Sequence, residues 1–313
     1  MLLILFIYCA VIVLSSLMGG ALPQLVRLTH TRMQMTTSLV GGLMLGIALF
    51  HLLPHGVYEL DSLDRGIWWM VMGLITTFFL LRMFHFHNHG IAEVDHVGYD
   101  LQTDCDHEHD HDHDLKAAIS PGPVATEACE KHPHRLSWMG VFIGLSVHTL
   151  IDGLALGASV QASAAHGEST IGLYGLGTFL AIVLHKPLDA VSITSLMSSA
   201  GWSKSSQQKV NLAYAMICPL GAFLFVLGIN QLGDQSQVVI GCALAFSAGV
   251  FLSIALSDLL PELEFHAHDR ATLSAALIVG LALAYGLIYL EPTHQRNQNL
   301  PLNQIEAPAE TTP

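Results

Sequence analysis

Long apolar runs separated by short polar stretches make up most of this chain. Eight of the runs are long enough to cross a bilayer core, which takes roughly 20 helical residues. A single helix satisfies its own backbone hydrogen bonds in lipid. The pattern therefore predicts an all-α integral membrane protein with eight transmembrane helices. Their expected ranges are 1–22, 36–57, 67–84, 136–162, 169–199, 207–229, 237–261 and 271–291.

Polar segments divide the chain into four parts. Residues 1–84 hold the first three predicted spans, and residues 136–291 hold the other five. Between them, residues 85–135 form a loop rich in His and Asp, and residues 292–313 form a tail with several prolines. Segments with so few apolar residues cannot build a core, so we expect the loop and the tail to be disordered.

Charge agrees with a membrane protein and gives its orientation. Charged residues make up 12% of the chain, against about 25% in soluble domains. By the positive-inside rule the long loop should be cytoplasmic and both termini should face outward. No basic stripe is present, which argues against a nucleic-acid partner. Nine basic residues fall on the side of the loop: Arg27, Arg32, Arg82, Lys116, Lys131, Arg135, Lys204, Lys209 and Arg270.

An internal repeat relates the second and the seventh predicted spans. The segment GLMLGIALFHLLP at 42–54 aligns without gaps to GVFLSIALSDLLP at 249–261, with eight identities in thirteen positions. The three-helix unit that holds the second copy begins five spans, an odd number, after the unit that holds the first, so the copies run in opposite directions through the membrane. This predicts inverted three-helix repeats, spans 1–3 and 6–8, around spans 4 and 5, an architecture common among secondary transporters.

Spans 4 and 5 each carry a His and an Asp four residues apart. HTLIDG at 148–153 contains His148 and Asp152, and HKPLDA at 185–190 contains His185 and Asp189. Residues four apart share one face of a helix. Imidazole nitrogen and carboxylate oxygen suit zinc and similar divalent ions. We therefore expect the two pairs to bind a divalent metal within the membrane.

A second interpretation of these pairs stays open. The Asp carboxylates could instead neutralise Lys186 through internal hydrogen bonds between helices. An Asp or Lys at mid-membrane costs about 2.5–3.5 kcal/mol, so such polar residues need a bound ion, an internal partner or a water-filled path. Pro187 lies between the His and the Asp of span 5. It lacks a backbone N–H, so we expect a kink and a carbonyl left free toward the cavity.

At these residues the chain resembles the ZIP family of divalent-metal transporters. The resemblance rests on eight spans, a His-rich loop after span 3, the His-x-x-x-Asp-Gly motif of span 4 and the His-Lys-x-x-acid motif of span 5. It implies that His148, Asp152, His185 and Asp189 form a transport site, with Met44 on span 2 able to add a thioether. Some family members hold two metals there. Lys186 departs from that pattern, and its ammonium could take the place of the second cation.

Other polar residues are candidates for the path of the metal and for its regulation. His51 and His55 at the end of span 2 match Asp258 and Glu262 in the repeat, so all four could be stations on the way in or out, or simply solvated helix ends. The tract at 104–114 alternates His with acidic residues and suits metal buffering or sensing, the alternative being a solvated spacer. Its four imidazoles belong to His107, His109, His111 and His113.

The function expected from these features is transport of a divalent metal, most simply zinc, into the cytosol by alternating access. Iron, manganese and cadmium stay open as substrates, and so does a homodimer. We expect a plasma or bacterial inner membrane, with an intracellular membrane as the alternative. A zinc efflux carrier of the cation-diffusion type would usually have six spans and a folded carboxy-terminal domain. A membrane metallohydrolase would need a motif such as HExxH within a membrane helix, and none of the eight predicted spans contains one, so an enzyme is not expected.

Overall fold

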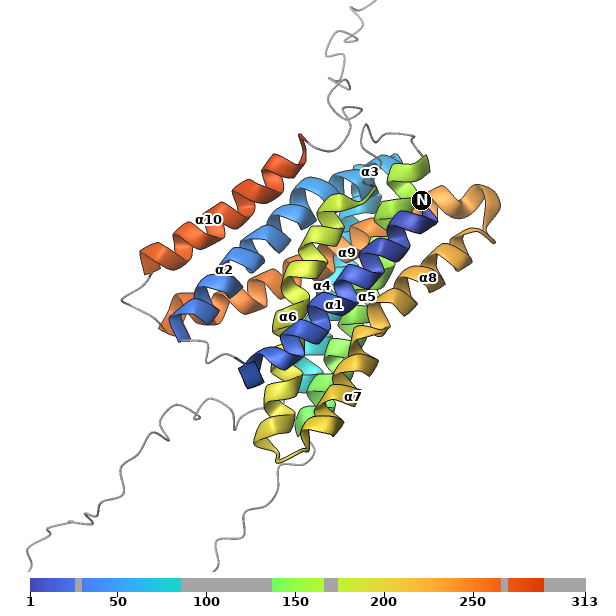
Figure 1. The fold of residues 1–313 in the computed structure, drawn as a ribbon. Coiled ribbons are helices and arrows are strands. Elements are labelled where there is room, and N and C mark those ends of the chain that lie inside the picture. The colour runs from blue at the N-terminus through green and yellow to red at the C-terminus, as the bar shows by residue number, and fades with distance from the viewer. Residues whose placement is uncertain (26–29, 86–136, 166–173, 266–269, 290–313) are drawn as a thin grey trace, which may run out of the picture.

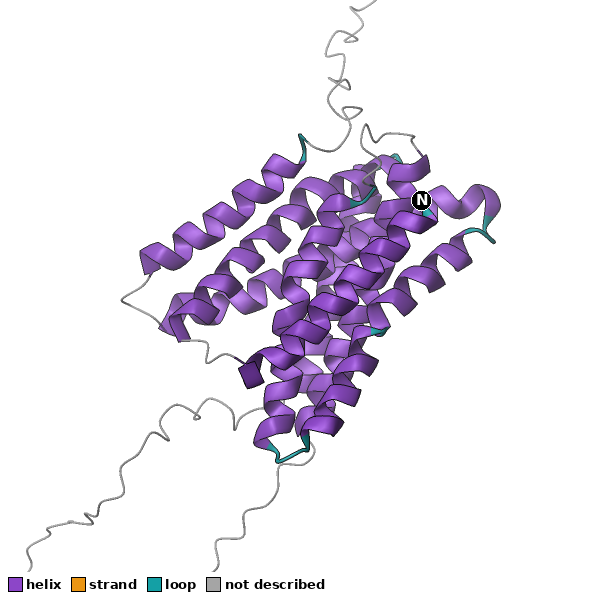
Figure 2. Ribbon diagram, in the orientation of Figure 1, coloured by secondary structure: helices purple, strands orange, loops and turns teal. Residues whose placement is uncertain are grey.

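The computed structural model describes residues 1–25, 30–85, 137–165, 174–265 and 270–289. All regular structure within these ranges is helical, as Figure 2 shows. The elements are α1 (Leu2–Leu25), α2 (His30–Ile47), a π-helical turn (Ala48–Leu52), α3 (Leu53–Leu60), α4 (Leu63–His85), α5 (Ser137–Ala165), α6 (Leu176–Ser199), α7 (Lys204–Ala215), α8 (Ile217–Ile229), a short 3₁₀ turn (Gly233–Gln235), α9 (Ser236–Phe265) and α10 (Arg270–Leu287).

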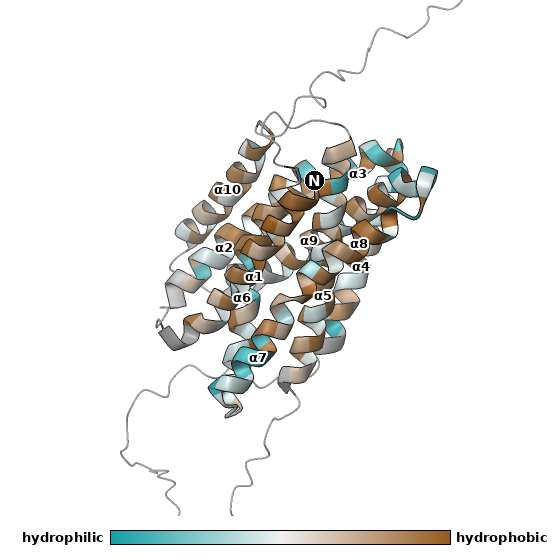
Figure 3. Cartoon of the chain, turned by 45° about the vertical axis from the view of Figure 1, so that its right-hand side comes forward, coloured by the Kyte–Doolittle hydropathy of each residue, from teal (hydrophilic) through white to brown (hydrophobic). Residues whose placement is uncertain are grey.

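The helices confirm the prediction of an all-α membrane protein. Seven helical segments of the described chain are long and apolar enough to cross a bilayer, and apolar residues cover much of their length (Figure 3). The eighth expected span coincides with α10, whose apolar part, Ala271–Leu287, is shorter than the others. The count of eight crossings therefore stays a prediction.

Two of the predicted spans are broken helices. In span 2 the helix widens to the π-helical turn just before Pro54, which has no N–H to continue the hydrogen-bond ladder. In span 6 the regular helix is interrupted at Met216, between α7 and α8. Pro219 lacks the N–H that would pair with the carbonyl of Ala215. The apolar run length that predicted these spans is insensitive to such interruptions, so neither was expected. The two prolines are the only local signal of them in the sequence.

Helix packing follows a reciprocal pattern. In one group α1 packs mainly on α6, and α5 packs mainly on α8; in the other α2 packs on α10, and α4 packs on α9 (Figure 1). In span order the helices are α1, α2–α3, α4, α5, α6, α7–α8, α9 and α10. Exchanging spans 1, 2, 3 and 4 with spans 6, 7, 8 and 5, respectively, turns each of these helix pairs into another pair of the same set. The pairing is the one that an inverted repeat would produce.

Matching glycines of the two repeat copies make matching contacts. A methyl group on Gly42 would collide with the carbonyl oxygen of Leu277 on α10, and one on Gly249 would collide with that of Met70 on α4. Such small residues let helix backbones approach closely in membranes. The close packing at these two glycines is therefore within one chain.

Candidate metal site between α5 and α6

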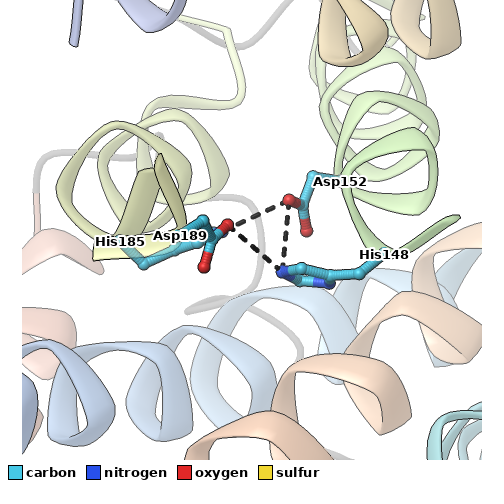
Figure 4. Close-up of side chains that lie close together, drawn as sticks. All are labelled: His148, Asp152, His185 and Asp189. Atoms are coloured by element: carbon cyan, nitrogen blue, oxygen red, sulfur yellow. Dashed lines mark hydrogen bonds and ion pairs between the residues drawn. The ribbon is translucent and has the colours of Figure 1, made fainter. Parts of the chain in front are cut away.

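Four polar side chains from two helices converge inside the bundle. His148 and Asp152 project from α5, and His185 and Asp189 project from α6 toward them (Figure 4). One nitrogen or oxygen of each residue lies within 4.8 Å of the others. Among the described residues, these four form the one cluster of at least three His, Cys, Asp or Glu side chains with such spacing.

Separations in the cluster fit a small divalent cation. The Nε2 atom of His185 lies 3.2 Å from Asp152 Oδ2 and 3.9 Å from Asp189 Oδ2. The Nε2 atom of His148 lies 3.5 Å and 3.8 Å from the same two oxygens. Ligands about 2.1 Å from a tetrahedral zinc ion lie about 3.4 Å from one another. The observed values bracket that figure, so small side-chain adjustments would complete a His₂Asp₂ ligand set.

Hydrogen bonding prepares the imidazole of His185 to act as a ligand, and the imidazole of His148 is left free to do so. The Nδ1–H of His185 donates to the carbonyl oxygen of Ala181 at 2.7 Å. In the neutral ring this leaves the lone pair on Nε2, which faces the carboxylate of Asp152. Both ring nitrogens of His148 and the Oδ1 atom of Asp152 are buried without a hydrogen-bond partner. A lone pair facing a carboxylate calls for a cation or a proton between them.

Lys186 is part of the same cluster. Its side chain is fully buried, and Nζ donates to Asp152 Oδ2 at 2.6 Å and to Asp189 Oδ2 at 3.2 Å. The expected alternative, in which the Asp residues neutralise Lys186, is thus present in the structure. It does not use up the ligand set, because both ring nitrogens of His148 and the second oxygen of Asp152 have no hydrogen-bond partner, and Nε2 of His185 faces the Asp152 carboxylate. Two carboxylates and one ammonium leave a single net negative charge for a metal to meet.

Sequence reasoning assigned no role to two hydroxyl groups that touch the cluster. Thr149 Oγ1 accepts a hydrogen bond from Lys186 Nζ at 2.9 Å and donates to the phenol oxygen of Tyr214 at 2.7 Å. The Tyr214 hydroxyl in turn donates to Asp189 Oδ2 at 2.9 Å. Tyr214 lies on α7, where no functional residue was expected. The available signal was a phenol within an apolar span, because a buried hydroxyl needs a partner.

The carbonyl freed by Pro187 is not left open to the cavity as expected. Pro187 removes the hydrogen bond to the carbonyl oxygen of Val183, four residues earlier. That oxygen accepts a hydrogen bond from the hydroxyl of Ser15 on α1 at 2.7 Å. A methyl group on Gly19, one turn along α1, would collide with the backbone of Pro187. The proline therefore serves the contact between α1 and α6.

Met44 lies on α2 and is buried to 1% exposure in the hydrophobic core. Its counterpart in the sequence repeat is Phe251 on α9. The Phe251 ring stands edge-on to the His185 imidazole, with centroids 6.1 Å apart. Phe251, which is the repeat counterpart of Met44, therefore lies next to the metal-site cluster.

The expected pathway residues of span 2 lie at a pocket away from the cluster. His51 and His55 line it together with the hydroxyl-bearing Ser159 and Thr178. His51 Nε2 donates to the carbonyl of Ala284 at 2.8 Å, and His55 Nδ1 donates to the carbonyl of His51 at 2.7 Å. His51 is buried, on the π-helical turn. These contacts are more specific than those of a solvated helix end.

The remaining candidates fall outside what the structure describes. Asp258 and Glu262 belong to α9, but their side chains are not among the described ones. The four loop histidines and the rest of residues 86–136 lie outside the described ranges. The tail from 290 onward lies outside them as well. The roles expected for these residues stay predictions.

Fold and site together indicate a multi-pass membrane protein with an internal His/Asp cluster that fits a divalent cation. The sequence profile described as ZIP zinc transporter matches residues 2–289. The chain therefore belongs to the ZIP zinc transporter family, and it is an integral membrane transporter of divalent metal. Membership of a transporter family also agrees with the expectation that it is not an enzyme.

Curated relatives are similar over most of the chain. Zinc transporter ZIP9 of Micropogonias undulatus is 27% identical over 282 residues, which cover 81% of this chain and 83% of the relative. Zinc transporter ZIP9-B of Xenopus laevis is 26% identical over 272 residues, or 80% of this chain and 82% of the relative. Zinc transporter ZIP10 of Danio rerio is 28% identical over 160 residues, half of this chain but 17% of that protein.

Proposed function

We propose that this protein carries zinc into the cytosol by alternating access, with His148, Asp152, His185 and Asp189 as the transport site. The observation that carries the proposal is the buried convergence of two imidazoles and two carboxylates at zinc-ligand spacing. His and carboxylate ligands hold zinc well, yet two of the four are carboxylates, which also suit manganese and iron. Those ions and cadmium are therefore further candidate substrates.

The site is proposed to hold one metal ion. Lys186 Nζ lies within hydrogen-bond distance of both carboxylates, where a second metal would have to be bridged. One divalent ion turns the net charge of the cluster from a single negative to a single positive charge. A second would add two more positive charges beside a fixed ammonium, which like-charge repulsion opposes.

Met44 and the pocket around His51 are proposed as parts of the path. Contact of Phe251 with His185 supports a place for Met44 near the site by repeat symmetry. At the pocket, two imidazoles and two hydroxyl groups offer weak metal ligands. Asp258 and Glu262, the repeat counterparts of His51 and His55 on α9, would supply carboxylates at the matching positions. Stations of this kind should have low affinity, because a path must release what it binds.

Topology supports uptake. The N-terminus lies at one end of the bundle, and the turn from α6 to α7, just before Lys204, lies at the other (Figure 1). With basic residues inside, the His-rich loop of 85–135 is cytoplasmic and receives the arriving metal. The reciprocal helix pairing supports the inverted repeats that alternating access uses. We place the protein in the plasma or bacterial inner membrane, and a homodimer is compatible with its exposed apolar helices.

Cytosolic metal distinguishes the proposal from its alternatives. Cells expressing the parental protein or His148→Ala at equal membrane abundance are given external zinc, and a cytosolic zinc indicator is followed over the first minutes. Uptake raises the signal in the parental cells alone. A fall in cytosolic zinc would indicate efflux, and no difference from His148→Ala would remove the site from the transport path.

A further inference from the structure

Tyr214, Thr149, Lys186 and Asp189 form a closed ring of hydrogen bonds beside the metal-site cluster. Lys186 donates to Thr149 at 2.9 Å, Thr149 donates to Tyr214 at 2.7 Å, Tyr214 donates to Asp189 at 2.9 Å, and Lys186 closes the ring on Asp189 at 3.2 Å. Every member is a side chain, and three helices, α5, α6 and α7, contribute. Apart from the two charged groups, the ring consists of hydroxyls.

Each hydroxyl in the ring has a fixed direction. The Lys186 ammonium can only donate, so Thr149 must accept from it and turn its own hydrogen toward Tyr214. Tyr214 then has its hydrogen left for the Asp189 carboxylate, which can only accept when ionised. The ring therefore orders both donors without an alternative arrangement. Hydrogen bonds aligned head to tail in a low-dielectric interior also strengthen one another.

Asp189 is the ligand that most needs this support. Its side chain is 19% exposed, against 0% for Asp152 and 5% and 10% for His185 and His148. Its Oδ2 atom accepts hydrogen bonds from Tyr214 and from Lys186, and both imidazoles lie 3.8–3.9 Å away. Asp152 instead has the His185 imidazole within hydrogen-bond distance, at 3.2 Å, as well as Lys186. Without the Tyr214 hydroxyl, Asp189 would keep one hydrogen bond, from the ammonium that repels the metal.

We infer that Tyr214 and Thr149 are positioning residues that set the zinc affinity of the transport site by holding Asp189 and the Lys186 ammonium in place. The inference rests on the proposed function. Neither hydroxyl need touch the metal; each acts through a charged neighbour. Removing a hydrogen-bond partner of a metal ligand commonly lowers metal affinity 10–100-fold.

Matched variants isolate the hydroxyl groups. Tyr214→Phe removes the hydroxyl group but keeps the aromatic ring, which packs near Phe142 and whose centroid lies 5.5 Å from Lys186 Nζ. Thr149→Val keeps the shape of the side chain, and Thr149→Ser keeps its hydroxyl. Tyr174→Phe, outside the hydrogen-bonded ring, controls for the loss of a phenol. The measurements are the zinc Kd of purified protein by calorimetry, the KM and maximal rate of uptake, and the melting temperature.

Tyr214→Phe and Thr149→Val should each raise Kd and KM for zinc about 10–100-fold. Thr149→Ser and Tyr174→Phe should stay at the parental affinity. Because both residues belong to one ring of hydrogen bonds, the zinc Kd of the double variant should be no higher than that of the single variant with the higher Kd. Parental Kd in both hydroxyl-free variants, a lower melting temperature at unchanged Kd, or effects that multiply in the double variant would overturn the inference. His148→Ala separates the two levels: if it transports normally the proposed function fails, whereas if it is inactive and Tyr214→Phe binds normally, the ring alone fails.

Discussion

The ammonium of Lys186 lies 2.6 Å from the carboxylate of Asp152, and neither side chain has any solvent exposure. Within a membrane protein such a pair stabilises both charges, because each alone would be buried without a counter-ion. Removing one partner of a buried ion pair costs about 3–5 kcal/mol in soluble proteins. Here the same pair also fixes one oxygen of a proposed metal ligand, so the proposal makes stability and metal binding depend on the same contact.

Lys186→Asp should convert the proposed one-metal site into one that holds two ions. The ammonium is replaced by a carboxylate beside Asp152 and Asp189, so like-charge repulsion disappears and a bridging ligand appears. Metal analysis of purified protein after zinc loading and desalting gives the number of ions per chain. Lys186→Met, which loses the ammonium without adding a ligand, is the matched control and should not retain a second ion.

Two zinc ions held by the parental protein would contradict the role given to Lys186. So would a Lys186→Asp protein that retains one ion while its abundance and melting temperature stay normal.

Asp189→Ala and His185→Ala should abolish zinc uptake while the protein still reaches the membrane. Each removes one of four converging ligands, and a three-ligand site loses most of its affinity for zinc at transport concentrations. Initial uptake per amount of membrane protein is the measurement. Ser192→Ala is a suitable control on the same helix, since the Ser192 hydroxyl is exposed and bonds only its own helix, at the carbonyl of Leu188. Parental uptake in either ligand variant would exclude that residue from the site.

The sequence predicted the helices and the two His/Asp pairs because both follow from spacing. Apolar run length determines what can cross a membrane, and a four-residue interval puts two side chains on one helix face. Contacts between distant segments have no such local rule. Tyr214 reaches Asp189 only because α7 packs beside α6 and carries Tyr214 at its end, one residue before its last residue, Ala215. The Ser15 bond to Val183 depends likewise on how α1 lies against α6.

Gly42→Ala and Gly249→Ala should each lower the melting temperature and the amount of folded protein. The added methyl group would meet a backbone carbonyl of the partner helix, which cannot rotate away, and overpacking of this kind typically costs about 1–3 kcal/mol. Gly286→Ala on α10 and Gly228→Ala on α8 are matched controls, because nothing lies within 4 Å of the added methyl group. Detergent-solubilised protein followed by fluorescence-detected thermal melting provides the comparison. Equal melting temperatures for all four variants would show that the close approach of these helices is not tightly constrained.

Deleting residues 104–114 should leave the initial rate of zinc uptake near the parental value while weakening the response to high cytosolic zinc. The tract places His107, His109, His111 and His113 at two-residue intervals among acidic residues. On the cytoplasmic side, where the positive-inside rule predicts it, the tract would follow the proposed transport site in the direction of uptake, so it can bind arriving zinc but is not needed for the crossing. Imidazole binds zinc only when neutral, so its capture of zinc should weaken as pH falls through about 6.5.

Deletion of the neighbouring residues 115–125, which are equal in number and contain no His, controls for loop length. Uptake is followed before and after the cells are loaded with zinc, together with the amount of protein in the membrane. The 104–114 deletion should lose the slowing of uptake, or the fall in abundance, that loading causes, and the control deletion should keep it. Loss of initial uptake in the first deletion alone, with normal insertion, would mean that the His tract takes part in the crossing itself. A parental response to loading in both deletions would mean that zinc supply is sensed elsewhere.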